Sequence, residues 1–362
     1  MKKSLAGLGL CFLVSAAASA GSSLTASSQP PALYAAFSVP GAMSTFATGI
    51  NNSGVIAGYY IDANLVGHGM IRLASGTMAT FDIPGAGSAP GEGTFAMSIN
   101  GSGNVSGFYN DADFQYHGFL LTPGGAITTF DVPGSAGTMP MSINEAGSVA
   151  GYYNLPDGTS GGFVRQADGA FATLESPGAM FTTLSGLNAA GTAVGTSGPS
   201  SAPYQGILFT ASGIATTFVA PDAGTNLNSG TEDISINLQG ATAGFYSDQN
   251  YVGHGFLRNA GGVGITEFNA PGAGTVSGSG TFAQSINAAD TITGYILDNN
   301  SVHYGFLRTS SGGILTFAAP GAGAASSQGT VAVTINSSDV IAGYYIDSSQ
   351  VAHGFVRTPG GQ

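Results

Sequence analysis

The hydrophobic positions of this chain come in short runs that are separated by turn residues. A typical run is residues 55–61, Val-Ile-Ala-Gly-Tyr-Tyr-Ile, which would be apolar on both faces of an extended strand. Both faces of such a strand have to be covered, so we expect it to lie between two other layers of β-structure. An Asn-x-x-Gly turn signal stands just before it, with Asn51 opening the turn and Gly54 in its left-handed position. The pattern predicts an all-β chain of short strands.

One unit recurs along the chain with a spacing of 44–50 residues. The predicted first strand of each copy ends in the dipeptide Ile-Asn, once Leu-Asn, and the asparagines are Asn51, Asn100, Asn144, Asn188, Asn237, Asn287 and Asn336. An aromatic pair or its remnant follows, then a His-Gly-Phe-like segment and a Thr-Phe-x-x-Pro-Gly-Ala-like segment. Each copy therefore predicts four short strands. A four-stranded repeat of this length is typical of a β-propeller, whereas the rungs of a β-solenoid, the other fold considered, are usually shorter.

The two ends of the chain are complementary parts of one repeat. The last copy stops soon after its third strand, and residues 35–42 form a fourth strand that has no first three strands before it. A closed ring explains this permutation because the N-terminal strand would complete the last copy, while an open stack gives no reason for it. We therefore predict a seven-bladed β-propeller over residues 33–362, with four antiparallel strands per blade, closed by the N-terminal strand.

The first twenty residues predict a secretory signal peptide. A positive head, Met1-Lys2-Lys3, precedes an apolar stretch, and Ala18-Ser19-Ala20 fits a small-residue cleavage site. Residues 21–32 are rich in Ser and Pro and predict a flexible leader. We therefore expect a secreted, extracellular protein of bacterial type, with association with the cell surface left open.

The composition limits the partners of the exported chain. Beyond residue 20 there is no lysine and no cysteine, and five arginines stand against 19 acidic residues, a formal net charge of −14. Disulfides therefore cannot support the fold, and the negative charge disfavours binding to nucleic acid or to anionic membrane surfaces. No later stretch has 18 apolar residues in a row, so no membrane span is expected. The sequence does not indicate the oligomeric state.

Around these motifs the sequence resembles the HAF-type extracellular repeat family, which is named for a His-Ala-Phe tripeptide. Here the tripeptide is His-Gly-Phe, and an Ile-Asn-x-x-Gly-x-x-x-Gly segment precedes it. The resemblance covers nearly the whole chain after the signal peptide. Glycine in place of alanine and the lack of tryptophan after the tripeptide depart from the family pattern. The resemblance implies a bacterial extracellular protein and no particular activity.

Aspartate and histidine recur together in the repeat, six residues apart. The four pairs are Asp62 and His68, Asp111 and His117, Asp248 and His254, and Asp347 and His353. In the sixth copy Tyr304 stands six residues after Asp298, and the third and fourth copies have Gly161 and Gln205 in place of the histidine. We interpret each pair as a structural latch across the hairpin between the second and third strands, in which the carboxylate binds the imidazole and favours its charged form.

The same loops form a candidate ligand face. In the usual propeller layout these hairpins and the long Gly/Ser-rich loops share one face, which would gather Asp62, Asp111, Asp113, Asp248, Asp298 and Asp347. One aspartate and one histidine per copy are too few for zinc. Asp111 and Asp113 are the best local pair for calcium, the one cofactor considered, although no loop has the EF-hand spacing. An acidic face of this kind suits a neutral glycan or a cationic protein partner.

Two other repeated features are interpreted as structural. The paired aromatic residues of the second strand, such as Tyr59 and Tyr60, are expected in the core between blades. Five arginines follow the third strand at one offset, and each is expected to pair with a nearby acid or carbonyl. They are Arg72, Arg165, Arg258, Arg308 and Arg357.

The sequence contains no recognisable catalytic motif. It has no His-Glu-x-x-His segment, no Gly-x-Ser-x-Gly segment and no cysteine beyond the signal peptide. We expect a scaffold that binds an extracellular glycan or protein. One alternative is a lyase or glycosidase that acts on polysaccharide near the fourth and fifth copies, where Glu232 and Asp233 are the one adjacent acidic pair. Adjacent strand residues point to opposite faces, so the pair is not a catalytic dyad by itself. The other alternative is a purely structural envelope or matrix protein.

Overall fold

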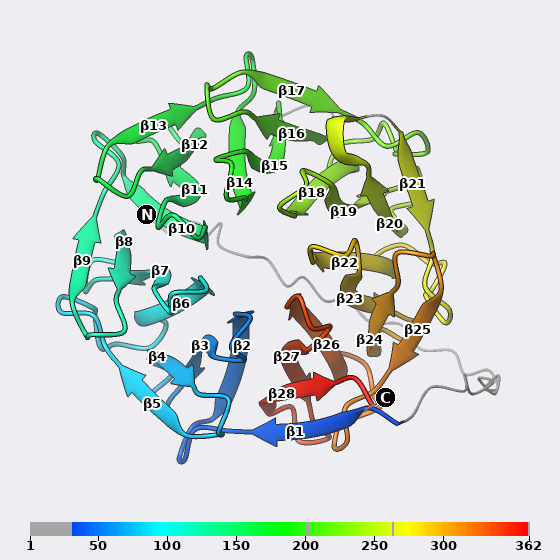
Figure 1. The fold of residues 1–362 in the computed structure, drawn as a ribbon, viewed down its shortest axis with the longest axis horizontal. Coiled ribbons are helices and arrows are strands. Elements are labelled where there is room, and N and C mark those ends of the chain that lie inside the picture. Colours follow the sequence, from blue (N-terminus) through cyan, green and yellow to red (C-terminus); the bar gives the residue numbers. More distant parts are fainter. Residues whose placement is uncertain (1–30, 200–202, 263, 361–362) are drawn as a thin grey trace, which may run out of the picture.

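A computed structural model describes residues 31–199, 203–262 and 264–360, so the predicted signal peptide lies outside the described residues. Apart from the short 3-10 turn η1 (Ala260–Gly262), the elements of these residues are all strands. They form a ring in which the first strand of each repeat lies nearest the centre and the fourth lies outermost (Figure 1). The prediction of an all-β, propeller-like fold is confirmed. In the part of the chain that is described, no helix is long and apolar enough to cross a membrane.

Each repeat contains four strands. The first strands are β2 (Ser44–Ile50), β6 (Gly93–Ile99), β10 (Gly137–Ile143), β14 (Phe181–Leu187), β18 (Gly230–Ile236), β22 (Gly280–Ile286) and β26 (Gly329–Ile335). The second strands are β3 (Ile56–Ile61), β7 (Val105–Asn110), β11 (Val149–Asn154), β15 (Ala193–Gly198), β19 (Thr242–Ser247), β23 (Ile292–Leu297) and β27 (Ile341–Ile346). The third strands are β4 (Gly67–Arg72), β8 (Tyr116–Leu121), β12 (Ser160–Arg165), β16 (Gln205–Phe209), β20 (Gly253–Arg258), β24 (His303–Arg308) and β28 (Ala352–Thr358). The fourth strands are β5 (Met78–Phe81), β9 (Ile127–Phe130), β13 (Phe171–Leu174), β17 (Ala215–Phe218), β21 (Ile265–Phe268), β25 (Ile314–Phe317) and, from the other end of the chain, β1 (Leu33–Phe37).

Neighbouring strands of a repeat pair antiparallel, as in the series β2, β3, β4 and β5. The third strand of some repeats also meets the first strand of the next repeat through a single parallel bridge, such as Gly67 opposite Gly93. These bridges join the strands into sheets of 12, 8 and 8 strands. The strand β1 pairs with β28, with Phe37 opposite Gly354, so the N-terminal strand completes the last repeat (Figure 1).

The hydrophobic core lies between consecutive repeats. One buried cluster joins Ala57 and Ile83 of the first repeat to Ala96, Val105 and Phe119 of the second. Strands such as β3 are therefore covered on both faces, which explains why their sequences are apolar throughout.

The glycine of the His-Gly-Phe segment is required by close packing. The ring of Phe81 on β5 lies over Gly69 on β4, and a Cβ atom on that glycine would lie 2.3 Å from the ring. The same contact recurs at Gly118, Gly206, Gly255, Gly305 and Gly354, each beneath a phenylalanine of the adjoining fourth strand. The phenylalanine of the Thr-Phe-like fourth strand therefore requires glycine, rather than alanine, in the tripeptide of the third strand.

The repeated arginines lie against aromatic rings instead of acids. Each guanidinium carbon lies 4.7–5.0 Å from the centroid of a phenylalanine on the fourth strand of the preceding repeat, as Arg72 does over Phe37. Among the described residues, every ion pair within 4.0 Å involves a histidine, so the expected acid partner is absent there. Some arginines, such as Arg72, also donate to the carbonyl oxygen of the next residue. These stacks fasten one repeat to the next.

Candidate functional sites

The aspartate and histidine pairs meet at one face of the ring, at the turns that follow the second strands. The histidine Nε2 lies 3.2–3.7 Å from an aspartate Oδ2 in the pairs His68 and Asp62, His117 and Asp111, His254 and Asp248, and His353 and Asp347. Their side chains are half-buried. The structure thus brings all four predicted pairs together.

Each of these histidines has a closer second partner, which the sequence analysis missed. The Nδ1 atoms lie 2.8 Å from Asp82, 3.0 Å from Asp131, 2.8 Å from Asn269 and 2.7 Å from Ser38. Each partner directly follows the last phenylalanine of a fourth strand. The imidazole therefore links the turn to the fourth strand. It also stacks on a tyrosine of the second strand in three repeats, as His68 does on Tyr60 at 4.8 Å.

A signal for these partners is present in the sequence. Asp, Asn or Ser follows the phenylalanine where the repeat has its histidine. The other three repeats have Glu175, Val219 and Ala318 at that position. Comparing this position across the repeats would have identified the fourth-strand partner.

The aspartates also cap their own turns. Oδ1 of Asp62 accepts hydrogen bonds from the amides of Asn64 at 2.8 Å and Val66 at 2.9 Å, and these bonds hold the pKa of Asp62 below its ordinary value. Asp298 caps its turn in the same way, although its repeat has no histidine six residues later. The turn cap is therefore independent of the histidine.

His117 lies between two carboxylates, as His68 does, and its Nε2 is closer to the turn aspartate, at 3.4 Å against 3.7 Å. Burial acts to lower its pKa, but Asp131 and Asp111 outweigh burial through hydrogen bonds and charge, and the pKa is raised. Oδ1 of Asp111 already accepts the amides of Asp113 and Gln115, and its Oδ2 faces His117. Within the described ranges, no group of three or more His, Cys, Asp or Glu side chains is arranged to hold a metal ion.

The same turns expose large side chains from an unfavourable backbone conformation. Leu65, Phe114 and Tyr251 have φ angles of 64°, 57° and 61°, in the left-handed region. Their side chains are 50%, 46% and 39% exposed. In the third repeat Gly158 takes this place. Only glycine adopts the left-handed conformation freely, and other residues lose about 1–2 kcal/mol there.

The long loops between repeats brace these turns. The carbonyl oxygen of Leu65 accepts a hydrogen bond from the amide of Gly91 at 2.8 Å. The carbonyl oxygen of Tyr251 accepts one from Gly278 at 2.9 Å, and its hydroxyl donates to the carbonyl oxygen of Leu227 at 3.2 Å. We call the surface formed by the second-to-third-strand turns and these loops the hairpin face.

Glu232 and Asp233 do not share a site. Asp233 is 0% exposed on β18, and burial raises its pKa well above the ordinary value. Neither of its carboxylate oxygens has a well-formed hydrogen bond, although the Thr242 hydroxyl lies close by. Glu232, the preceding residue, is only partly buried, and desolvation raises its pKa to about 7.

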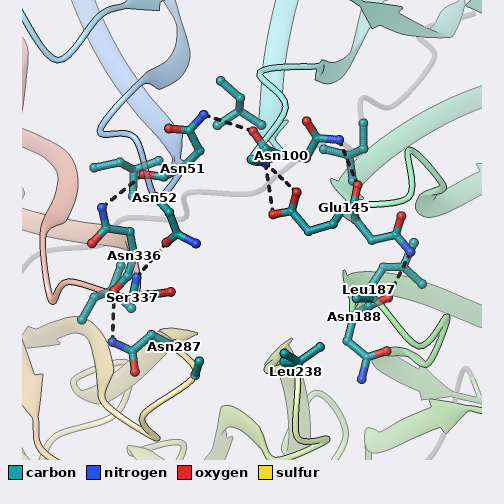
Figure 2. A pocket seen from close by; sticks show the side chains of 18 of the residues that line it. Asn51, Asn52, Asn100, Glu145, Leu187, Asn188, Leu238, Asn287, Asn336 and Ser337 are labelled. Carbon is teal, nitrogen blue, oxygen red and sulfur yellow. Dashed lines mark hydrogen bonds between the residues drawn. The ribbon is translucent and has the colours of Figure 1, made fainter.

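On the opposite face the repeated Ile-Asn dipeptides surround the centre of the ring (Figure 2). The Nδ2 of each asparagine donates to the carbonyl oxygen of the next repeat's asparagine at 3.0–3.3 Å, and Asn336 donates to Asn51, which completes the circle. The Oδ1 atom caps the following turn, as Asn51 does for the amide of Val55 at 3.0 Å. The ring surrounds a cavity of about 290 Å³, which we call the channel mouth. The Asn-x-x-Gly pattern predicted turns at asparagines of this kind but did not predict the ring.

Comparison with known proteins shows the fold and no family. No family model matches the chain, and no curated protein matches it. Puromycin hydrolase is similar with a TM-score of 0.55 and 13% identity over 86% of this chain and 52% of that one, so the chain spans about half its length. The β-propeller domain of the Trilobed protease from Pyrococcus furiosus has a TM-score of 0.55 and 7% identity, covering 88% of this chain and 98% of that one. The BP39L lectin from Burkholderia pseudomallei has a TM-score of 0.56 and 9% identity with the same coverage. The chain is therefore propeller-like in fold.

Proposed function

We propose that this chain is an exported, seven-bladed β-propeller that binds an extracellular ligand through its hairpin face. Each group of four antiparallel strands is then one blade, and the single parallel bridges are contacts between blades. The pairing of β1 with β28 and the unbroken circle of asparagine hydrogen bonds support a closed ring of seven. The propeller-like fold suits a rigid scaffold but does not choose a ligand by itself.

The observation that carries the binding role is the exposure of Leu65, Phe114 and Tyr251 from left-handed backbone. Gly158 relieves the same position in the third repeat without loss of the turn. Three large side chains are kept there at a cost in backbone conformational energy, and between 39% and 50% of each remains exposed. Strain that is retained at exposed side chains is typical of functional surfaces. These side chains therefore favour a ligand on this face over a purely structural role.

A neutral glycan fits this face better than a protein. The exposed rings of Phe114 and Tyr251 offer apolar surfaces for the C–H face of a sugar, and exposed side-chain amides in the turns, such as those of Asn250 and Asn300, offer hydrogen bonds to its hydroxyls. The net charge of the exported chain, −14, disfavours acidic sugars. The similarity in fold to the BP39L lectin agrees with this choice.

A glycan-array screen of purified residues 21–362, run with calcium and again with chelator, tests the proposal. Binding to one class of neutral sugar in both conditions would support it. Loss of binding under chelator would assign a calcium ion to the acidic turns, with Asp111 and Asp113 as first candidates. A blank array in both conditions would contradict the glycan assignment and favour a protein partner or a structural envelope role.

One observation favours the enzyme alternative. Desolvation raises the pKa of Glu232 to about 7, in the range that a general acid needs near neutral pH. A polysaccharide lyase or glycosidase would then use Glu232 without Asp233, which is fully buried. The test is to incubate the protein with the polysaccharide that the array identifies and to measure the release of reducing ends. Release that Glu232→Gln abolishes would support an enzyme. Binding of the polysaccharide without release of reducing ends would contradict an enzyme.

A further inference from the structure

A groove between the first and second repeats breaks the symmetry of the ring. It lies on the face opposite the hairpin face, has a volume of about 450 Å³ and is lined by residues that include Val55, Ile71, Leu73, Met78 and Pro123. Leu73 is 47% exposed although it lies in this groove. The other six repeats have Thr, Gln or Asn at its position: Thr122, Gln166, Thr210, Asn259, Thr309 and Thr358.

Val55 also differs from most repeats. It follows its ring asparagine by four residues, where the seventh repeat has Val340, the fifth has Ala241 and the other four have polar side chains: Asn104, Ser148, Thr192 and Thr291. Val55 and Leu73 thus make one groove apolar where most repeats are polar. The strands and turns of the repeat do not require either apolar side chain, because other repeats form them with polar residues at these two positions. An apolar concavity where one repeat differs from most others is a candidate ligand site.

The groove adjoins the channel mouth, because Asn51 and Gly101 line both. The one charged side chain that lines either cavity is Glu145, at the edge of the mouth (Figure 2). Its Oε1 and Oε2 atoms accept the amide of Gly101 at 3.1 Å and 2.9 Å, which places the carboxylate where the two cavities join. The equivalent residues elsewhere are Asn52, Gly101, Ala189, Leu238, Ala288 and Ser337, none of them charged.

We propose that this groove and the adjoining channel mouth bind a small organic cation with an apolar body. The apolar body lies against Val55, Leu73 and Met78, and the ammonium group lies at the Glu145 carboxylate. The volumes of about 450 Å³ and 290 Å³ fit a small molecule. No basic side chain lines either cavity, so nothing there repels a cation. This site is separate from the hairpin face and does not depend on the function proposed for it.

Isothermal titration of residues 21–362 tests the proposal, with 4-phenylbutylammonium as the probe and the neutral 4-phenylbutan-1-ol as its matched control. The ammonium should bind about fivefold more tightly than the alcohol, as expected for a partly exposed ion pair. Glu145→Gln keeps an acceptor for the amide of Gly101, and it should reduce ammonium binding to the level of the alcohol. Leu73→Thr installs the residue of four other repeats and should weaken both probes by about fivefold.

Leu315→Thr is the matched control, because it also replaces an exposed leucine by threonine but does so away from the site. Leu315 is on the outer strand β25 and lines neither cavity. The substitution should leave both affinities unchanged. Equal binding of ammonium and alcohol would overturn the role of Glu145. If Leu73→Thr does not weaken binding of the probes, the proposed site is wrong. It is also wrong if the natural protein binds neither probe up to about 10 mM.

Discussion

Asp233 is a buried acid at a position where the ring otherwise has small or apolar residues. The equivalent residues Ala47, Ala96, Ala283 and Ala332 are fully buried alanines. Asp233 has no well-formed hydrogen bond for either carboxylate oxygen. Replacing it by alanine should therefore stabilise the protein, which is unusual for a substitution in a core.

The size of the effect follows from two opposing contributions. A buried polar group without a hydrogen bond costs about 1–3 kcal/mol, and Asp233→Ala removes that cost. The atoms removed leave a small space, which opposes the gain by about 1 kcal/mol. We expect the free energy of unfolding to rise by up to about 2 kcal/mol near pH 4.5.

The stability gained by Asp233→Ala should grow as the pH rises. Burial raises the pKa of Asp233 in the folded state above its ordinary value of 3.8, so the unfolded chain loses this proton first as the pH rises. The stability of the natural protein is therefore lost progressively from about pH 4 upward, and Asp233→Ala is free of that loss. Glu232, whose pKa is about 7, adds a similar loss between its ordinary value of 4.5 and 7 in both proteins.

Urea unfolding followed by circular dichroism at pH 4.5 and pH 7.5 measures both effects. Ala283→Asp in the next repeat is the reciprocal control and should destabilise, by about 3 kcal/mol or more at the higher pH. A loss of stability in Asp233→Ala at both values of pH would refute the reasoning. It would mean that the hydroxyl of Thr242 and the charge of Arg258, which both act to lower the pKa of Asp233, stabilise the carboxylate more than burial destabilises it.

Three further substitutions test the packing and the two hydrogen-bonded networks. Gly255→Ala places a Cβ atom 2.5 Å from the ring of Phe268 and should lower the urea-unfolding free energy by about 1–3 kcal/mol, so an unchanged value would contradict the close-packing argument. Asn144→Ala removes one hydrogen bond of the asparagine ring and one turn cap and should cost about 1–3 kcal/mol, while Asn144→Asp, which loses the ring bond and keeps the cap, should cost less; no cost at all for Asn144→Asp would show that the ring bond contributes nothing. The pKa of His117 is raised, so the stability it contributes is fully present below its ordinary value of 6.5 and is lost as the pH rises through the folded value. His117→Ala should therefore destabilise more at pH 5.5 than at pH 8.5, and equal effects at both pH values would remove the carboxylates as the cause.

The architecture could be predicted because one sequence pattern recurs along the chain at a regular spacing. The spacing of the Ile-Asn dipeptides and the unpaired fourth strand at residues 35–42 predicted a ring of four-stranded units, and β1 does pair with β28. The second strands are apolar on both faces, which predicted a core between repeats. Ala57 and Val105 pack in that core. Both signals arise from local strand patterns, which short stretches of sequence carry well.

The contacts between repeats could not be predicted in this way. The stack of Arg72 on Phe37 joins the first repeat to the strand that completes the last repeat, and no local pattern contains it. The bond from Asn336 to Asn51 likewise needs the ring to be closed before the two residues meet. The strained turns were missed because Leu65, Phe114 and Tyr251 are not residues that favour a left-handed conformation, and a sequence rule assigns none of them to it.

The central claim is that the hairpin face retains strained side chains because they bind a ligand. The variant Leu65→Asn/Phe114→Asn/Tyr251→Asn tests it, because asparagine tolerates the left-handed backbone and the turn bonds can remain. Glycan-array binding and the urea midpoint would be measured on this variant and on the natural protein. We predict that the midpoint is unchanged or raised while binding to the array is lost. Array binding that persists in the triple variant, with the fold intact, would contradict the account.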